Sequence, residues 1–252
     1  MMIDLHSHVL PGLDDGAPDL EASVAMARAA AADGVEALAA TPHVREDYAT
    51  SPEDMEHALF LVRRAVAEAG VPLDLLPGGE IAIDELPKLA VEELRRFGLG
   101  GNPGVILVEF PYVGLRLDLE QRLFELRTRG FVPVLAHPER NPEVQKDPGV
   151  LERMVSAGTL VQLTAASVDG RLGRRARTAA HALLERELAH MIASDAHAPE
   201  VRAIGMSSAA AAVGDSGLAR WLTQDVPRAI VDGAPVPERP GATPRRRRLF
   251  RR

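Results

Sequence analysis

Short apolar runs alternate with amphipathic helical segments along this chain, and His, Asp or Glu residues stand where most of the apolar runs end. Continuous Val, Ile and Leu runs are typical of strands buried on both faces, as in a parallel sheet. In α/β barrels the active site lies at the carboxyl ends of such strands. The alternation therefore predicts an α/β fold with polar side chains gathered at one end of the strands. These residues are His6, His8, Asp14, Asp15, His43, Glu80, Glu109, His137, Asp195 and His197.

Hydrophobic periodicity and capping residues divide the chain into about seven strand–helix units. Alternation at this length favours one barrel domain, a (β/α)7 arrangement, over an open sheet. The predicted strands are 2–5, 35–40, 73–76, 105–110, 131–136, 160–163 and 190–193. The predicted helices are 19–33, 52–69, 85–97, 117–129, one within 142–157, 174–187, and one or two within 204–231.

The end of the chain differs in composition from the rest. Residues 234–252 are rich in Pro, Gly and Arg and are predicted to be a disordered tail after a single domain at 1–233. Without the six arginines at 245–252, the chain holds 23 basic and 36 acidic residues, a net charge of -13. An acidic body disfavours general nucleic-acid binding, so no nucleic-acid partner is expected. The tail itself could contact anionic surfaces.

The chain contains no cysteine. This excludes disulfides, thiolate metal ligands and a cysteine nucleophile, and it fits a reducing compartment. The N-terminal sequence lacks the basic and apolar regions of a signal peptide, and no run of about 18 apolar residues occurs. A cytoplasmic location is therefore expected.

Two pairs of polar residues have the spacing of metal ligands. His6 and His8 flank Ser7 after the first predicted strand, and Asp195 and His197 follow the last one. Residues two apart in a strand point to the same side, so each pair could hold one metal ion. A polar loop after a strand is the alternative for each pair. The recurrence of the spacing at both ends of the chain favours metal binding.

Other candidates stand inside or just after apolar segments. Glu109 lies within the run 105–110, where a buried unpaired carboxylate would be costly, so a metal or a salt bridge to arginine must satisfy it. His137 follows the run 131–136, where a lone His is more often structural. His43 and Glu80 are weak signals when each is taken alone.

The donor set contains only nitrogen and oxygen, which suits Mn, Fe or Zn. Nine ligands are more than one ion needs, so two or three ions that share carboxylates are expected. Such a cluster would bind a phosphate and lower the pKa of a bridging water. Asp14 and Asp15 could form only a turn before Gly16, but one of them is expected to complete the site. Arg140 and Arg202 follow predicted ligands closely and could bind phosphate oxygens, the alternative being surface arginines.

These motifs resemble the polymerase-and-histidinol-phosphatase (PHP) superfamily. Within it, the chain is similar to the bacterial CpsB/CapC/YwqE-type tyrosine-protein phosphatases of capsule and exopolysaccharide loci. The matching motifs span about residues 3–202, and the first motif and AHPERN are the most specific. They are IDLHSHVLPGLDDGA at 3–17, ATPH at 40–43, GGEI at 78–81, LVEFP at 107–111, AHPERN at 136–141 and ASDAH at 193–197. The segment 44–48 departs from the commoner pattern, and the arginine-rich end is not part of it.

The resemblance implies a distorted seven-stranded barrel with a trinuclear, often Mn-dependent site. It implies that Arg140 and Arg202 bind phosphate, while a metal-bound water or His43 could supply a proton to the leaving group. The implied activity is hydrolysis of phosphotyrosine on the tail of a partner tyrosine kinase that controls polysaccharide export. The implied metal ligands are His6, His8, Asp15, His43, Glu80, Glu109, His137, Asp195 and His197.

Other functions stay open at this point. A small-molecule phosphatase of the histidinol-phosphatase type would share the metal chemistry. A DNA exonuclease is disfavoured by the acidic body. A carbamate-bridged amidohydrolase would need a lysine at a strand end, and neither Lys88 nor Lys146 is placed there. A non-catalytic adaptor with a basic tail is the alternative from a different class, and the chain could form a homo-oligomer.

Overall fold

Two β-sheets and the helices around them make up the computed structural model, which describes residues 1–111, 114, 118–198 and 203–241. The strands in this part of the chain are β1 (Met2–Ser7), β2 (Val35–Ala40), β3 (His43–Arg45), β4 (Tyr48–Ala49), β5 (Asp74–Leu76), β6 (Glu80–Ala82), β7 (Val105–Glu109), β8 (Val132–Ala136), β9 (Leu160–Thr164) and β10 (Met191–Ala193). The α-helices are α1 (Leu20–Ala32), α2 (Pro52–Glu68), α3 (Val91–Arg96), α4 (Leu119–Thr128), α5 (Pro142–Lys146), α6 (Glu152–Ser156), α7 (Ala165–Val168), α8 (Arg174–Glu185), α9 (Met206–Val213), α10 (Ser216–Arg220) and α11 (Val226–Val231). Three short 3-10 helices, η1 (Leu99–Gly101), η2 (Pro138–Arg140) and η3 (Pro148–Leu151), and one π-helical turn, η4 (Trp221–Asp225), complete the set.

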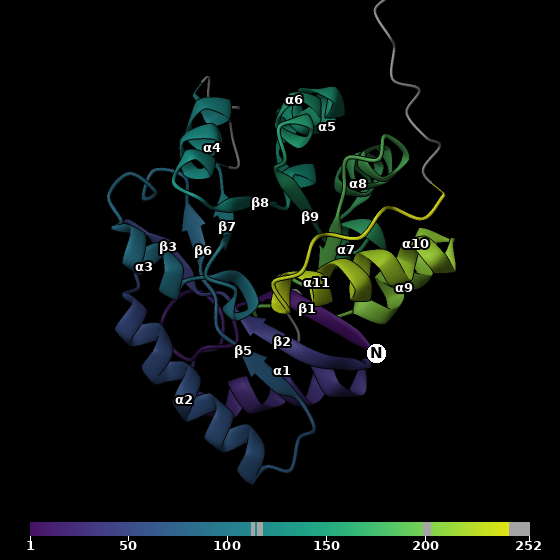
Figure 1. The fold of residues 1–252 in the computed structure, drawn as a ribbon. Helices are drawn as coiled ribbons and strands as arrows, with labels where there is room; N and C mark the ends of the chain where they lie inside the picture. Colours follow the sequence, from purple (N-terminus) through teal and green to yellow (C-terminus); the bar gives the residue numbers. More distant parts are fainter. Residues whose placement is uncertain (112–113, 115–117, 199–202, 242–252) are drawn as a thin grey trace, which may run out of the picture.

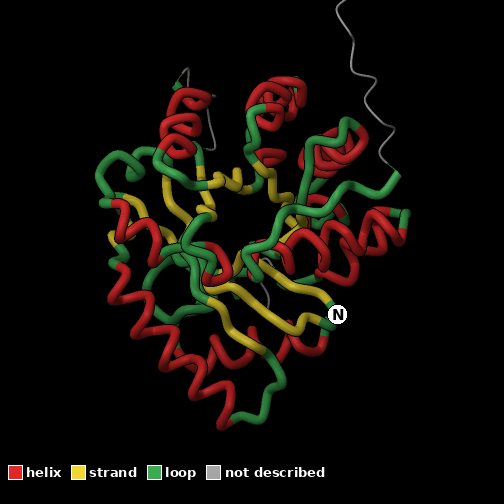
Figure 2. The backbone as a smooth tube through the Cα atoms, in the orientation of Figure 1, coloured by secondary structure: helices red, strands yellow, loops and turns green. Residues whose placement is uncertain are grey.

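The strands pair mostly in parallel. One sheet has the order β1-β2-β5, and the other has the order β10-β9-β8-β7-β6-β3-β4, with β3 and β4 as an antiparallel hairpin. The two sheets meet at the carboxyl end of β1, where Ser7 forms a bridge with Ala196 and accepts a hydrogen bond from Thr41 N at 2.8 Å. Strands surround the interior and most helices lie outside them (Figure 1, Figure 2). The predicted single-domain α/β class is confirmed.

The strand pairing of the described residues leaves two separate sheets, so the predicted distorted seven-stranded barrel is not confirmed. Pro42 separates β2 from β3, and Pro77 with two glycines separates β5 from β6. Because proline cannot donate to a ladder, it interrupts a strand. After each interruption the chain changes sheets: β2 pairs with β5 in the smaller sheet, and β3 pairs with β6 in the larger one. The sequence analysis did not predict β3, β4 or β6.

Local capping explains where some helices begin. Ser51 caps α2, which was predicted at 52–69: its Oγ accepts from Asp54 N at 3.1 Å, and the Asp54 carboxylate accepts from Ser51 N at 3.2 Å. The helix predicted at 85–97 is wrong in its first half, because only α3 forms there. Pro87 removes a backbone donor and disfavours helical geometry in the residue before it.

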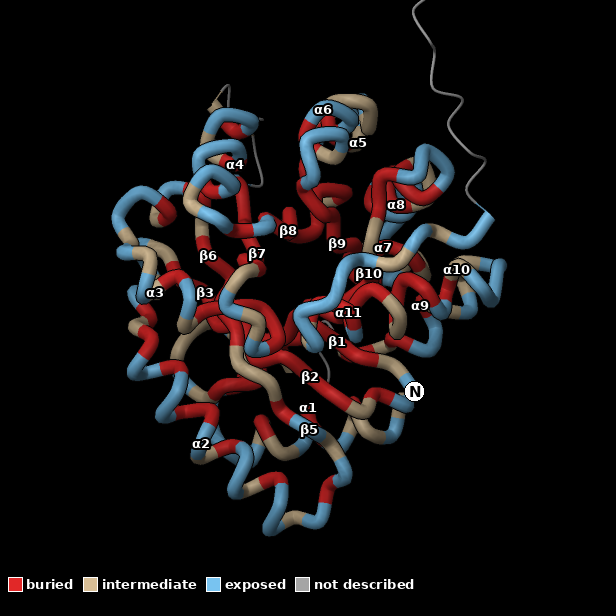
Figure 3. The backbone as a smooth tube through the Cα atoms, viewed as in Figure 1, coloured by how far each residue is buried: buried red, intermediate tan, exposed pale blue. Residues whose placement is uncertain are grey.

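The core is built from the aliphatic residues of the strands. All five residues of β7 are buried, and the buried positions follow the strands while exposed positions lie on the outer helices (Figure 3). Among the described residues, Phe97 is the largest side chain that is fully buried. None of the described helices combines the length and apolar composition that a bilayer crossing requires.

The first part of the predicted tail packs on the body without helix or strand. Trp221 Nε1 donates to Pro237 O at 3.0 Å. The Arg239 guanidinium donates to Leu184 O at 2.8 Å and to Ala189 O at 3.1 Å. Residues 242–252 lie outside the described residues, so the disordered tail and its boundary stay predictions.

Candidate metal centre

Five histidines and four carboxylates converge where the two sheets meet. Most are held at the ends of strands, as expected for a fold with parallel strands. They are the nine residues that the resemblance implied as ligands: His6 and His8 at the end of β1, Asp15 before α1, His43 and Glu80 at the starts of β3 and β6, Glu109 at the end of β7, His137 after β8, and Asp195 and His197 after β10.

The ligand atoms form four overlapping groups. Within each group, one nitrogen or oxygen per residue lies within 4.8 Å of the others. Several residues belong to two groups, and shared ligands are what a cluster of neighbouring ions requires. The groups are His8, Asp15, His43 and His197; His6, His8 and Glu80; His6, His137 and Asp195; and His43, Glu80 and Glu109.

Two buried carboxylates lie between the histidines. Oε2 of Glu80 is 3.3 Å from Nε2 of His6 and 3.4 Å from Nε2 of His8. Oδ1 of Asp195 is 3.3 Å and 3.2 Å from the same two nitrogens. The other oxygen of Glu80, Oε1, is 2.8 Å from Nε2 of His137. Glu80 and Asp195 therefore each face more than one imidazole, which is the position of a bridging ligand.

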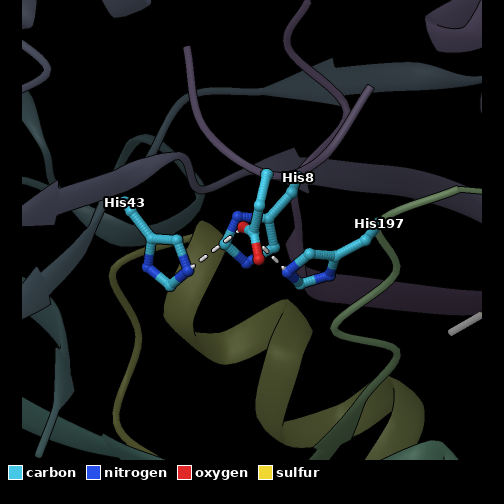
Figure 4. Close-up of side chains that lie close together, drawn as sticks. His8, His43 and His197 are labelled. Atoms are coloured by element: carbon cyan, nitrogen blue, oxygen red, sulfur yellow. Dashed lines mark ion pairs between the residues drawn. The ribbon is translucent and has the colours of Figure 1, made fainter. Parts of the chain in front are cut away.

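Asp15 lies between two further histidines of the cluster. Its Oδ1 lies 3.5 Å from Nε2 of His43 and 3.3 Å from Nε2 of His197. His8, His43 and His197 approach one another from separate segments of the chain (Figure 4). The Asp15 side chain is 43% exposed, whereas those of the other eight residues are at most 5% exposed. The cluster therefore opens to solvent beside Asp15.

Charge pairing shifts the ionisation of the cluster. Burial alone would lower the pKa of His6, but the charges of Glu80 and Asp195 raise it on balance. Burial would raise the pKa of Asp195, yet the charge of His6 and hydrogen bonding from His8 hold it well below its ordinary value. A protonated His6 would offset the negative charge of Glu80 and Asp195, and a bound cation would take over that role while releasing protons.

The residues present fit divalent cations. Oε1 of Glu109 is buried and has no hydrogen-bond donor among the residues that the structure describes. Burial and the charge of Glu80 raise the pKa of Glu109. Carboxylates this close in a nearly dry site repel one another unless positive charge separates them. Imidazole nitrogen and carboxylate oxygen together are ligands for Mn, Fe and Zn.

Two further residues orient His6 and His8 by hydrogen bonding to the Nδ1 atom of each ring. Oε1 of Gln162 lies 3.0 Å from Nδ1 of His6, and Oδ2 of Asp14 lies 2.7 Å from Nδ1 of His8. Asp14 also accepts from the backbone N–H of His43 at 3.0 Å. Burial would raise the pKa of Asp14, but hydrogen bonding and charge from His8 lower it to about 2. The sequence had pointed to the Asp14-Asp15 pair, whereas nothing in it singled out Gln162.

Two candidate ligands have uncommon backbone geometry. His137 and Asp195 are left-handed, with φ of 34° and 52°. Such geometry in a non-glycine residue costs roughly 1–3 kcal/mol and clusters at functional sites. At Asp195 the turn is held by its own N–H, which donates to His6 O at 2.9 Å. His137 directly follows β8, Asp195 follows β10 after one residue, and both side chains belong to the cluster.

The structure describes only one of the two arginines that were predicted to bind phosphate. Nη1 of Arg140 donates to Oδ2 of Asp195, so its guanidinium lies at the edge of the cluster. The Arg140 side chain is 17% exposed and can still be reached by a ligand. Arg202 lies outside the described residues, so its role stays a prediction.

The β3–β4 hairpin brings two residues to the site that the sequence analysis did not assign. Nη1 of Arg45 lies 3.5 Å from Oε2 of Glu109, while Asp47 binds the rest of its guanidinium, with Arg45 Nε 2.7 Å from Asp47 Oδ1. The ring of Tyr48 stacks on the ring of His43, with centroids 5.8 Å apart. The Arg45–Glu109 contact joins residues 64 positions apart, which a sequence pattern does not reveal.

The other described histidines and lysines lie outside the cluster. His57 is exposed on α2, and His181 Nε2 lies 3.1 Å from Val168 O. His190, the first residue of the strand predicted at 190–193, lies just before β10. Lys88 pairs with Glu85 at the surface, and Lys146 is exposed at the end of α5, so no described lysine stands at a strand end.

Comparisons with known proteins identify relatives of the chain. A family model described as capsular polysaccharide synthesis, CpsB/CapC, matches residues 2–223. The tyrosine-protein phosphatase YwqE of Bacillus subtilis (strain 168) is 36% identical over 202 residues, which cover 80% of this chain and 79% of the relative. The putative tyrosine-protein phosphatase CapC of Staphylococcus aureus is 30% identical over 197 residues, covering 78% and 77%.

A solved structure has the same fold over nearly the whole chain. It comes from crystal structures of YwqE from Bacillus subtilis and CpsB from Streptococcus pneumoniae, described as unique metal-dependent tyrosine phosphatases. The TM-score is 0.85 at 30% identity, and the match covers 95% of this chain and 98% of the other.

Proposed function

The chain belongs to the CpsB/CapC family of capsular polysaccharide synthesis proteins, and from this we propose that it is a metal-dependent protein-tyrosine phosphatase. The observation that carries the proposal is the convergence of five imidazoles and four carboxylates into overlapping groups of metal-ligating geometry. A non-catalytic adaptor would not need all nine donors in one cluster. A carbamate-bridged site is disfavoured because no described lysine reaches it.

We propose that the cofactor is two or three divalent metal ions. Manganese is the metal proposed first, and iron and zinc are the alternatives. When bound, they would neutralise phosphate charge and activate a water for attack on phosphorus. The residues proposed to hold them are His6, His8, Asp15, His43, Glu80, Glu109, His137, Asp195 and His197.

The chain's own residues position the phosphate and the leaving group. Arg140 sits at the cluster edge through Asp195 and can offer N–H groups to phosphate oxygens, where it would stabilise the charge that builds up in the transition state. Arg202 is proposed for the same task. His43 lies beside Asp15 on the open side, and its ring nitrogen that does not hold a metal is proposed to give a proton to the leaving phenolate. Since the pKa of tyrosine is about 10, this help matters less than for an alkyl phosphate.

The proposed substrate is phosphotyrosine on the tail of a tyrosine kinase that regulates capsular or exopolysaccharide synthesis. The names of the relatives and of the family model support this substrate class. A cytoplasmic location and a homo-oligomeric state are kept as proposals that rest on the sequence alone.

Metal-dependent turnover tests the function. We expect the chelated protein to lose phosphotyrosine-peptide hydrolysis and manganese to restore it, with two or three ions per chain by elemental analysis. Arg140→Ala should lower kcat by about 10²–10³-fold, by analogy with the loss of one transition-state donor. Arg153→Ala, which removes an exposed arginine paired with Glu120, is the control. Undiminished turnover after thorough chelation, or faster hydrolysis of histidinol phosphate than of the peptide, would contradict the proposal.

A further inference from the structure

A surface hollow of about 400 Å³ lies between α5 and α8, which are neighbours in the fold (Figure 1). We call it the basic hollow, and its lining residues are Pro142, Gln145, Lys146, Arg174, Arg175 and Thr178. Arg177 is exposed on α8 and, with Arg174, lines an adjoining hollow that also contains Glu185. Four cationic side chains therefore gather over two short stretches of chain.

These four cations lack the pairing seen elsewhere on the surface. Among the residues that the structure describes, none of them has a carboxylate within 4.0 Å. Some exposed arginines on other helices do pair: Arg64 lies 3.1 Å from Glu68, and Arg220 lies 3.2 Å from Asp225. The hollow is thus a locally positive surface on a body whose net charge is negative.

Helix stability does not account for the arginines of α8. The first turn of α8 contains no acidic residue, and no side chain caps its first backbone donors. Positive side chains near the amino end of a helix are unfavourable, because the helix dipole is positive there. Arg174 and Arg175 are also exposed, so they do not serve packing of the core.

The hollow adjoins the candidate metal centre. Pro142, at its edge, lies two residues after Arg140, a span of at most about 7 Å. Gln145, which lines the hollow, is hydrogen-bonded to η2: its Nε2 donates to Glu139 O at 3.0 Å. α8 also packs against η2, the element that carries Arg140. A ligand that extends from Arg140 would therefore reach the hollow.

We propose that the basic hollow binds the acidic flank of the phosphopeptide substrate, a segment carrying Asp or Glu close to the phosphotyrosine. This inference rests on the proposed function. The four cations stand on two helices, α5 and α8, so a segment with several carboxylates could pair with more of them than a single phosphate could. An extended peptide rises about 3.3 Å per residue, so the span of about 7 Å from Arg140 to Pro142 corresponds to about two residues, and the nearest acidic residue would lie about two positions from the phosphotyrosine.

Charge reversal tests the proposal. The variant is Arg174→Glu with Arg175→Glu, and the control is Arg28→Glu with Arg64→Glu, which makes the same charge change on α1 and α2. Two phosphotyrosine peptides are compared, one with Asp and Glu flanks and one with Asn and Gln flanks. We expect the ratio of kcat/KM, acidic over amide peptide, to fall about tenfold in the variant but not in the control, and the difference to shrink in high salt.

A binding measurement separates this inference from the phosphatase proposal. The unphosphorylated acidic peptide, labelled with a fluorophore, is titrated with the metal-loaded full chain, and anisotropy is read. Weaker binding in the Arg174/Arg175 variant than in the control supports the hollow even if no turnover is found. An active enzyme whose selectivity ratio and anisotropy are the same in variant and control would overturn the hollow and leave the phosphatase proposal standing. An effect seen only with phosphatidylserine vesicles and not with the peptide would also overturn it.

Discussion

Nε2 of His6 lies 3.3 Å from Nε2 of His8. Each ring is held from behind at Nδ1, by Oε1 of Gln162 and by Oδ2 of Asp14. Since both of these oxygens accept, each neutral ring carries its proton on Nδ1 and directs the lone pair of Nε2 inward. Two lone pairs at this separation repel unless a proton or a cation lies near them. Burial lowers the pKa of both histidines, but their carboxylate neighbours raise it on balance: the charges of Glu80 and Asp195 act on His6, and hydrogen bonding to Asp14, Asp195 and Glu80 acts on His8.

Metal removal should therefore lower stability as well as activity. A ligand present at about 100 times its Kd adds about 2.7 kcal/mol to the free energy of unfolding, which for a chain of this size is a Tm rise of roughly 5–10 °C. We expect manganese to produce such a rise in differential scanning calorimetry and a chelator to reverse it. His6→Ala should lose most of the rise, whereas His57→Ala, on the exposed side of α2, should keep it. An equal rise in both variants would contradict the assignment of His6.

Asp14 should act on the metals through His8. Asp14→Asn keeps the size of the side chain but removes the charge that orients the imidazole and increases its basicity. Loss of such a supporting carboxylate typically costs 10–100-fold in metal affinity. We expect a manganese Kd raised by that factor in isothermal titration calorimetry. Asp74→Asn, an exposed change on β5, is the control. Unaltered affinity in Asp14→Asn would show that the 2.7 Å contact with His8 is dispensable.

The nine candidate ligands could be identified from the sequence because each belongs to a motif that the resemblance covers, and most follow or begin an apolar run. Gln162 could not, since it sits inside Leu-Val-Gln-Leu-Thr and only the fold brings it within 3.0 Å of His6. The choice between Asp14 and Asp15 came from the resemblance, and the structure places both near the cluster in different roles.

The fold class was predictable from strand–helix alternation, whereas the pairing of the strands was not. Proline interruptions at Pro42 and Pro77 are visible in the sequence, but which sheet each following segment joins depends on contacts distant in the chain. The β3–β4 hairpin has strands of three and two residues, which are too short to show a period. Its contribution to the site, through Arg45 and Tyr48, was missed for that reason.

Tyr48 is placed to favour an aromatic leaving group. Its ring stacks on His43, and the Arg45 guanidinium lies 5.1 Å from the ring centroid, beside the open side of the cluster. An aromatic pair contributes about 0.5–1.5 kcal/mol beyond burial, so Tyr48→Ala should raise KM for a phosphotyrosine peptide about 2–10-fold. KM for p-nitrophenyl phosphate should rise similarly, and KM for an alkyl phosphate should not. Tyr48→Phe should behave as the wild type, and a loss in Tyr48→Phe equal to that in Tyr48→Ala would point to the hydroxyl instead of the ring.

His190, outside the metal centre, should make stability fall with acid. Its Nδ1 accepts from Val161 N at 3.2 Å, so the ring is neutral in the folded chain. Burial, and then the charge of Arg239, lower its pKa from 6.5 to about 4. Above pH 6.5, His190 is unprotonated in both the folded and the unfolded chain. Between pH 6.5 and pH 4, only the unfolded chain binds a proton at His190. The free energy of unfolding therefore falls as pH falls, by roughly 3 kcal/mol in all. His190→Asn keeps an acceptor near the Nδ1 position but does not titrate. In urea unfolding from pH 7 to pH 4, its stability should therefore fall less steeply than that of the wild type, and parallel curves would show that His190 is protonated in the folded chain.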